Sequence, residues 1–273
     1  GSLASGYLTL EASQELIINT QKNTQQPFQL NLFIDQTNKN TEYVSKPEEL
    51  LALEHELTMQ SPSQIEIMPA LSVDALISLA IETNVPVISP TFGLLDLKQI
   101  KKVKAAGTTL MTTINSLVDA HMAMALNEPD VLIYQNKLAG GHQGGFNTQD
   151  NGNVDISDSA ILALKKEYPN VLIVKSGAIV TRDDIESALQ EGFDGVQIGT
   201  AFLATIESSA SPEHKEAILA AHKSCDTCFS KNVTGKCARG IKNKLMQLAL
   251  NEEVHYPQQH YATLPIRTYA CHF

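Results

Sequence analysis

The sequence predicts an α/β fold made of parallel βαβ units, a (β/α)8 barrel. Three observations predict it. Short apolar runs rich in β-branched residues recur along most of the chain, and helical patterns lie between most of them. Strand, helix and strand in this order give parallel strands joined by crossover helices. The length of 273 residues, with 43% hydrophobic residues, suits one large domain of this type.

The expected strands are short, and they follow one another at the spacing of βαβ units. They cover residues 1–4, 28–34, 85–89, 108–114, 131–135, 171–176 and 195–198. A (β/α)8 barrel has eight strands, so this count is one short, and the first run is already cut at the start of the chain. We therefore expect one strand and its loop to precede Gly1 in the natural protein. A doubly wound open sheet is the competing interpretation of the same alternation.

The expected helices are placed by apolar periodicity and by residues that begin or end helices. They cover residues 10–20, 47–57, 73–81, 94–105, 116–126, 157–167 and 182–190. Ser116 and Thr181 are expected N-caps, and Gly107 and Gly192 are expected helix stops. Residues 65–68, in the least regular region, are a further candidate for a barrel strand. After Leu203 the alternation ends, and we expect helices at residues 212–222, 224–236 and 239–250.

Composition limits the class of partner and the compartment. Thirty acidic residues against twenty basic ones give a net charge of −10, which repels nucleic acids and anionic membranes. The sequence has no apolar run near the roughly 18 residues that span a bilayer, and its first residues lack a signal-peptide pattern. Four cysteines in so long a chain do not make a disulfide framework. We expect a cytoplasmic protein without nucleic-acid or membrane partners, and a homodimer is compatible with the sequence.

A glycine-rich loop after the fifth expected strand carries the candidate chemistry. The segment VLIYQNKLAGGHQGG, residues 131–145, passes from an apolar strand into a loop with four glycines around His142. Glycines let main chain approach a flat or anionic ligand closely. A histidine held there can exchange a proton near neutral pH, so His142 is the candidate general base. The alternative is a surface turn with a solvated imidazole.

Further polar and glycine residues follow other expected strands. Barrels carry their functional groups on the loops at the carboxyl ends of the strands. Here those loops hold Asn31, Gln135, residues 176–178, Gly199 and Thr200. Backbone N–H groups in the last two turns suit a phosphate, so the sequence implies a phosphorylated cofactor.

Four residues near the C-terminal end have the spacing of a possible metal site: His222, Cys225, Cys228 and Cys237. Zinc needs four such ligands converging on a tetrahedron. A lone CxxC more often places two small apolar residues on neighbouring turns of a helix, so we assign no metal.

Seven segments resemble the nitronate monooxygenase family, formerly called 2-nitropropane dioxygenases. They are QPFQLNLF, VPVISPTFG, KAAG before TTLMTTINSLVDA, QNKLAGGHQGG, KSGAI, DGVQIGTAFL with Glu207 behind it, and TGKCARGIKN. Their order and spacing match that family over almost the whole chain. The resemblance implies an FMN-dependent TIM barrel, an oxidoreductase that oxidises alkyl nitronates such as propionate 3-nitronate with dioxygen.

By motif, the resemblance also implies the site and the domains. His142 would be the active-site base, and FMN would be bound by Asn31, Gln135, Gly140, Gly141, Gly177, Ala178, Gln197, Ile198, Gly199 and Thr200. Residues 1–205 would form the FMN-binding barrel, residues 206–255 a small helical lid over the substrate, and residues 256–273 a return segment packing on the barrel. A nitronate or nitroalkane and dioxygen would be the small-molecule partners.

Two places depart from the family pattern. Relatives typically carry two glycines where this chain has Gly177 and Ala178; alanine keeps the backbone N–H but is strained wherever φ must be positive. Asn136 and Leu138 stand where relatives often have Gly and Glu. Two other functions stay open: an FMN-dependent enoyl-ACP reductase, which shares the AGGH and phosphate-loop pattern, and a non-catalytic flavin-binding barrel.

Overall fold

The computed structural model describes residues 1–34, 43–67, 71–146, 156–252 and 255–270. The chain forms two compact units. Unit 1 comprises Gly1–Asp35, Ala70–Lys137 and Gly144–Gln197, and unit 2 comprises Gln36–Pro69, Leu138–Gln143 and Ile198–Phe273. The expected lid and return segments both fall within unit 2; the expected boundaries at residues 205 and 255 stay a prediction.

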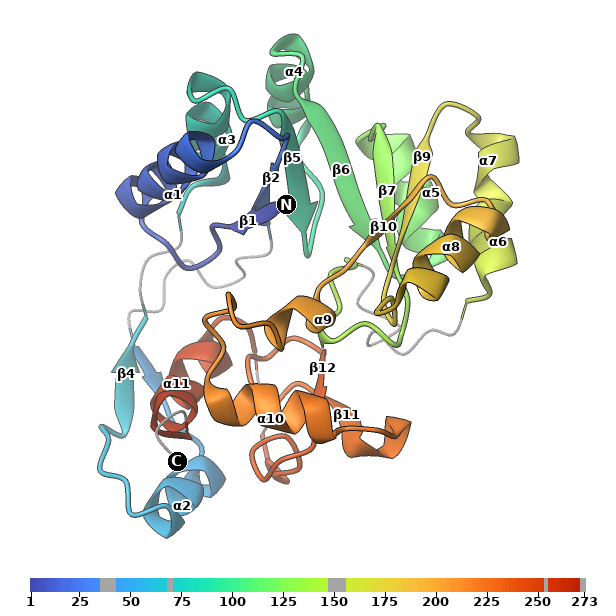
Figure 1. Cartoon of the computed structure of the whole chain (residues 1–273). Helices are drawn as coiled ribbons and strands as arrows, with labels where there is room; N and C mark the ends of the chain where they lie inside the picture. Colours follow the sequence, from blue (N-terminus) through green and yellow to red (C-terminus); the bar gives the residue numbers. More distant parts are fainter. Residues whose placement is uncertain (35–42, 68–70, 147–155, 253–254, 271–273) are drawn as a thin grey trace. The chain divides into compact units, whose positions relative to one another are not determined.

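Unit 1 is built on a seven-stranded sheet in which every neighbouring pair is parallel. The strands lie in the sheet in the order in which they occur in the chain: β1 (Ser2–Ala4), β2 (Gln29–Phe33), β5 (Val87–Thr91), β6 (Thr109–Ile114), β7 (Val131–Gln135), β9 (Leu172–Ser176) and β10 (Gly195–Gln197) (Figure 1). A doubly wound sheet would reverse its order at a switch point. The seven expected strands and the TIM-barrel type of fold are therefore confirmed.

The helices of unit 1 connect these strands, and five of the seven begin at a residue whose side chain caps the helix. They are α1 (Leu10–Asn23), α3 (Val73–Glu82), α4 (Leu97–Ala105), α5 (Leu117–Leu126), α6 (Asp158–Leu162), α7 (Leu164–Glu167) and α8 (Arg182–Glu191). Ser116 and Thr181 form capping boxes with Asp119 and Asp184, as expected. The helix expected from residue 94 starts at Leu97, because Asp96 caps it. The helix expected over residues 157–167 is divided at Ala163.

The core of unit 1 lies between the sheet and its helices. Leu30 and Leu32 of β2, Ile88 of β5, Ile17 of α1 and Ile77 of α3 have no exposed surface. Burial of each such side chain contributes roughly 1.5–3 kcal/mol. This packing fixes the strand ends from which the functional loops leave the sheet.

Unit 2 contains the segments that the alternating pattern did not resolve. A two-stranded antiparallel ladder joins β3 (Tyr43–Ser45) to β4 (Gln64–Glu66), so the suggestion that residues 65–68 form a barrel strand is wrong. The adjoining helices are α2 (Glu48–Glu56) and α11 (Gln258–Ala270). Leu50 and Leu53 of α2 pack in one cluster with Leu245, Ala262 and Ile266.

Unit 2 also has a second antiparallel sheet, which forms where the sequence predicted two helices. Its order is β11 (Thr227–Ser230), β12 (Ala238–Ile241) and β8 (Gly141–His142). The helices expected over residues 224–236 and 239–250 are therefore wrong, and only the short 3-10 turn η2 (Ser224–Asp226) precedes β11. The turn between the two longer strands includes Gly235, where φ is +87° and an added Cβ would lie 2.3 Å from the His255 carbonyl carbon. The expected helix at 212–222 is α10 (Pro212–Ala220), which follows the short α9 (Thr200–Leu203).

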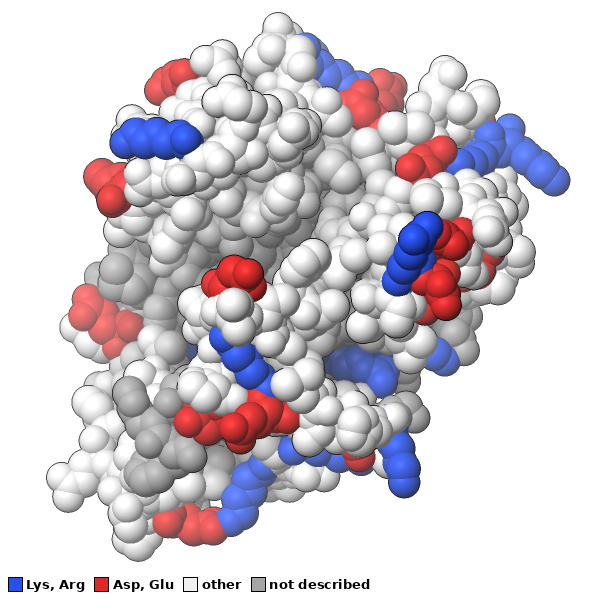
Figure 2. Space-filling view, viewed as in Figure 1, with Lys and Arg blue, Asp and Glu red and all other residues white. Residues whose placement is uncertain are grey.

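Oppositely charged side chains pair on the surface of α8. In Figure 2, blue and red side chains lie next to one another over α8, where Arg182 Nε lies 2.6 Å from Glu186 Oε1. Both side chains are exposed, so the pair contributes little to stability. Among the helices of the described ranges, none is both long enough and apolar enough to cross a membrane.

Unit 2 also holds a buried ion pair. Lys46 Nζ lies 2.5 Å from Glu54 Oε1, with 0% and 4% of the two side chains exposed. Ser61 completes the group, because its hydroxyl donates to Glu54 Oε2 at 2.7 Å and contacts Lys46 Nζ. Each charge is thus desolvated and has a partner.

We predict that Lys46→Met lowers the free energy of unfolding by about 3–5 kcal/mol, because the Glu54 carboxylate would remain buried without its counterion. The double variant Lys46→Met/Glu54→Leu should recover much of that loss. Urea unfolding followed by circular dichroism measures both. Lys104→Met, which removes the exposed Lys104–Glu128 pair, is the control and should have little effect. A loss in Lys46→Met no larger than in this control would contradict the prediction.

Candidate functional site

The expected site residues divide between the two units. Gln135, Gly177, Ala178 and Gln197 belong to unit 1, at or just after the carboxyl ends of its strands. Asn31 also belongs to unit 1 but lies within β2, two residues before its end, so its expected place on the loop after the strand is wrong. The other expected residues belong to unit 2, and they are Gly140, Gly141, His142, Ile198, Gly199 and Thr200.

In unit 1, three strands end in register. Gln135 of β7 pairs with Ser176 of β9, and Ser176 pairs with Gln197 of β10. The segments that follow these residues therefore leave the sheet at the same edge. This is the arrangement that the strand-end argument predicts for a barrel.

Asn31 ties β2 to β5. Its Nδ2 donates to the Ser89 carbonyl at 2.9 Å, to Ser89 Oγ at 3.0 Å and to Thr91 Oγ1 at 2.8 Å. The donor side of this amide is thus directed at the neighbouring strand. Asn31 therefore has a structural role within the sheet.

Gln135 fixes the far end of the glycine-rich loop. Its Oε1 accepts from Gly144 N–H at 2.8 Å and from Asn115 Nδ2 at 3.1 Å. Asn115 Nδ2 also donates to the Gln135 carbonyl at 2.7 Å, and Asn115 Oδ1 accepts from Gly145 N–H. The Asp119 carboxylate accepts from Asn115 N–H at 2.8 Å and from Phe146 N–H at 3.3 Å. These bonds hold the loop by its backbone.

Two glycines of this loop are required for space. A Cβ on Gly144 would lie 2.9 Å from Thr113 Cγ2, and one on Gly145 would lie 2.5 Å from Asp119 Oδ2. Sequence reasoning missed Asn115 and Asp119. The available signal was that Asn115 directly follows β6, at the same edge of the sheet as Gln135, and that Asp119 lies in the first turn of the next helix.

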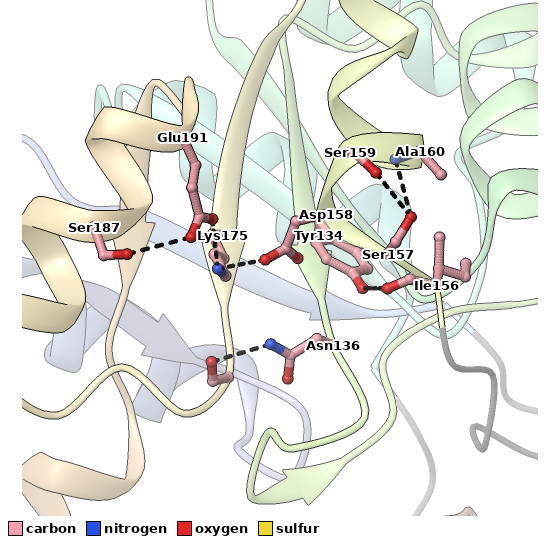
Figure 3. A network of polar contacts seen from close by, with 11 residues as sticks. Tyr134, Asn136, Ile156, Ser157, Asp158, Ser159, Ala160, Lys175, Ser187 and Glu191 are labelled. Carbon is pink, nitrogen blue, oxygen red and sulfur yellow. Dashed lines mark hydrogen bonds and ion pairs between the residues drawn. The ribbon is translucent and has the colours of Figure 1, made fainter.

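The turn after β9 has an unusual backbone. Gly177 has φ +107° and Ala178 has φ +56°, a left-handed conformation that alanine rarely adopts. The expected strain at Ala178 is therefore present. Asn136, directly after β7, donates its backbone N–H to the Ser176 carbonyl at 3.0 Å and its Nδ2 to the Gly177 carbonyl at 3.2 Å (Figure 3).

In unit 2, the near end of the glycine-rich loop is part of a sheet. Gly141 and His142 form β8 and pair with Arg239 and Ala238 of β12. An added Cβ on Gly140 would lie 2.5 Å from Thr200 Oγ1, so Gly140 packs directly against the start of α9. The structure thus brings Gly140 and Thr200 together. Ile198 and Gly199 immediately precede that helix.

His142 is partly buried and held by a threonine. Its Nε2 lies 2.7 Å from Thr234 Oγ1, and that oxygen also accepts from Lys236 N–H at 3.3 Å. When the Thr234 hydroxyl donates to Nε2, the neutral imidazole carries its proton on Nδ1. Sequence reasoning did not single out Thr234, although it lies in the TGKCARG segment.

Electrostatics keep this imidazole neutral. Burial lowers the pKa of His142 to about 4, and the positive charges of Arg267 and Lys236 add to the effect. The pKa of His260 is also lowered to about 4 by burial, then by Arg267 and His142. His260 is buried, and Arg267 Nη2 donates to its carbonyl at 2.8 Å. Both imidazoles are uncharged at neutral pH.

The zinc-like spacing near the C-terminal end does not produce a cluster. Within the parts of the chain that the structure describes, no three His, Cys, Asp or Glu side chains come together as metal ligands. Cys225, Cys228 and Cys237 are free thiols, and Cys228 lies in a strand rather than a helix.

The chain matches known proteins along nearly its whole length. The sequence profile of the family described as nitronate monooxygenase matches residues 1–272. A probable nitronate monooxygenase of Bacillus subtilis (strain 168) is 31% identical over 272 residues, which cover 98% of this chain and 77% of that protein. One from Staphylococcus haemolyticus (strain JCSC1435) is 31% identical over 275 residues, covering 98% and 76%.

Two solved structures are also similar. A nitroalkane oxidase from Streptomyces ansochromogenes has a TM-score of 0.82 and 27% identity, with 100% of this chain and 78% of that chain covered. FabK from Thermotoga maritima has a TM-score of 0.65 and 20% identity, with 99% and 69% covered. The second likeness concerns the fold alone.

The lowered pKa values of His142 and His260 predict that the folded protein is less stable in acid. Between pH 6.5 and 4 the unfolded chain takes up protons on His142 and His260 that the folded chain does not, so stability falls as pH falls through this window. From pH 7 to pH 5 we expect a loss of up to about 2 kcal/mol per imidazole.

Urea unfolding at pH 7 and pH 5 measures this loss. His260→Gln should make the loss smaller, whereas His214→Gln, at an exposed histidine, should leave it unchanged. Equal pH dependence in His260→Gln and the wild type would contradict the assignment.

Proposed function

The chain belongs to the nitronate monooxygenase family, and from that premise we propose that it oxidises alkyl nitronates, such as propionate 3-nitronate, with dioxygen and with FMN as cofactor. Membership makes it an oxidoreductase. The observation that carries the finer proposal is the glycine-rich loop itself. Separate sets of bonds hold its two ends, and a neutral histidine lies within it.

The donor set suits FMN. Neutral backbone N–H groups in the turns at Gly177 and Ala178 and at Gly199 and Thr200 are of the kind that bind phosphate. The strands before these turns, β9 and β10, end in register, which supports a shared role. An added Cβ at Gly199 would meet nothing within 4 Å, so the backbone there is accessible to a ligand.

The isoalloxazine ring would meet the other expected residues. Asn31 would offer its Oδ1 as an acceptor to the polar edge of the ring, because its Nδ2 donates to β5. Gln135 would offer its Nε2 as a donor, because its Oε1 accepts from the loop. Gln135 contributes in a second way, because its Oε1 fixes the loop at Gly144. Gly140, Gly141, Gln197 and Ile198 complete the proposed contacts of the flavin with main chain.

The mechanism follows from the state of His142. When bound, FMN supplies the electron transfer between the nitronate and dioxygen. A neutral imidazole protonated at Nδ1 can donate a hydrogen bond to a nitronate oxygen. To remove the α-proton of a neutral nitroalkane, Nε2 would have to exchange its contact with Thr234 for the substrate. The geometry therefore favours the anionic nitronate as substrate.

The charges around His142 favour the same substrate. Arg267 and Lys236, which lower the pKa of the imidazole, would also stabilise an anion beside it. An anionic substrate would in turn raise the pKa of His142, because its charge opposes that of the two cations.

A cytoplasmic location and a homodimeric state are further parts of the proposal.

The direct test is to mix the purified protein with FMN and supply propionate 3-nitronate in air without NADH. We expect a yellow bound flavin and oxygen uptake that depends on the nitronate. NADH consumption that depends on an enoyl thioester would instead support the reductase. A yellow protein inert to both substrates would support a non-catalytic flavin-binding barrel, and a colourless protein would exclude all three.

Replacing His142 by Asn should affect two substrates differently. We expect turnover of neutral nitroalkanes to fall by about 100-fold or more, because only they need a proton removed, and turnover of preformed nitronates to fall less. Steady-state oxygen uptake with both forms of one compound measures the ratio. His214→Asn, at an exposed histidine on α10, is the matched control. Equal losses on the two forms would rule out the base role.

A further inference from the structure

Asn136, one of the departures from the family pattern, is hydrogen-bonded in unit 1 to the turn that contains another, Ala178. Asn136 follows β7, and Gly177 and Ala178 follow β9, the strand beside it. Asn136 Nδ2 donates to the Gly177 carbonyl at 3.2 Å (Figure 3). Asn136 N–H donates to the Ser176 carbonyl at 3.0 Å. The bond from the side chain thus extends the β7–β9 ladder by one peptide into the turn.

The peptide that Asn136 holds is the one that carries the N–H of Ala178. A trans peptide is planar, and its carbonyl and N–H point in opposite directions. Fixing the carbonyl oxygen of Gly177 therefore fixes the orientation of the Ala178 N–H. That N–H is one of the groups proposed to bind the FMN phosphate.

The backbone conformation of Ala178 favours rotation of this peptide. Its φ of +56° is left-handed and is unfavourable for a residue with a Cβ. The strain would be relieved if the peptide between Gly177 and Ala178 rotated, which would redirect both its carbonyl and its N–H. The hydrogen bond from Asn136 opposes that rotation.

Other contacts of the surrounding network hold the strand. Lys175, two residues before Gly177, lies 2.6 Å from Asp158 and 3.0 Å from Glu191, which anchors β9 to α6 and α8 (Figure 3). Tyr134 Oη donates to the Ile156 carbonyl at 2.8 Å. Asn136 reaches past these contacts to the turn itself.

We propose that Asn136 is a positioning residue for the cofactor phosphate: its amide holds the peptide between Gly177 and Ala178 in the orientation that presents the Ala178 N–H, against the strain at Ala178. The inference rests on the proposed binding of FMN. It assigns to the two unusual residues a joint role that neither has alone.

The experiment compares FMN with riboflavin, which lacks the phosphate, by quenching of flavin fluorescence on the purified protein. Asn136→Ala should weaken FMN binding about five- to tenfold, roughly the loss of one neutral hydrogen bond, and leave riboflavin binding unchanged. Asn170→Ala, at an exposed asparagine before β9, is the matched control and should bind both flavins as the wild type does. Thermal unfolding of each apoprotein shows that the variants fold.

A second substitution tests the coupling. Ala178→Gly removes the strain, so FMN binding in this variant should equal or exceed that of the wild type. In the double variant Asn136→Ala/Ala178→Gly the loss of FMN affinity relative to Ala178→Gly should be about twofold or less, and this difference between backgrounds is the coupling.

The outcomes separate the inference from the function on which it rests. A wild-type protein that binds neither flavin would overturn both. The positioning role alone fails if the wild type binds FMN and riboflavin equally, or if Asn136→Ala binds FMN as the wild type does. It also fails if Asn136→Ala weakens both flavins alike, or if the loss is the same in the Ala178→Gly background.

Discussion

The hydrogen-bonded register of neighbouring parallel strands is the constraint on which the candidate site depends. Gln135, Ser176 and Gln197 come from distant parts of the chain, yet the ladders of β7, β9 and β10 place them side by side. Slippage by one residue would turn each side chain to the opposite face of the sheet. The fully buried residues of β7, such as Leu132, make such slippage costly and so hold the functional segments in place.

The sheet and its helices could be predicted because their signals are local. The apolar run at residues 131–135 and the caps at Ser116 and Thr181 act within a few residues of the chain, and each appears in the structure as expected. The strands β11 and β12 were missed for the opposite reason. Thr227–Ser230 and Ala238–Ile241 are only four residues long and have no strong periodicity, so tertiary pairing decides their conformation.

The sequence selects candidate site residues by their type but does not predict their hydrogen bonds. The strand-end argument selects Gln135, but its contact with Gly144 and with Asn115 depends on which segments meet at one edge. The same holds for His142. A histidine in a glycine-rich loop suggests proton transfer, whereas its lowered pKa comes from burial and from Arg267 and Lys236, which are far away in sequence. Such environments arise only from the folded chain.

The crowding of the glycine-rich loop limits how this protein could be made more heat-resistant. Replacing glycine by alanine often stabilises a protein by restricting the unfolded chain. Alanine cannot replace Gly140, Gly144 or Gly145 in this way. Its methyl group would overlap Thr200, Thr113 and Asp119, respectively. Alanine is also unfavourable at Gly141, because the φ of this residue is positive, +84°. The glycine-rich loop must therefore keep its high chain entropy in the unfolded state, and stabilising substitutions have to be made in other parts of the chain.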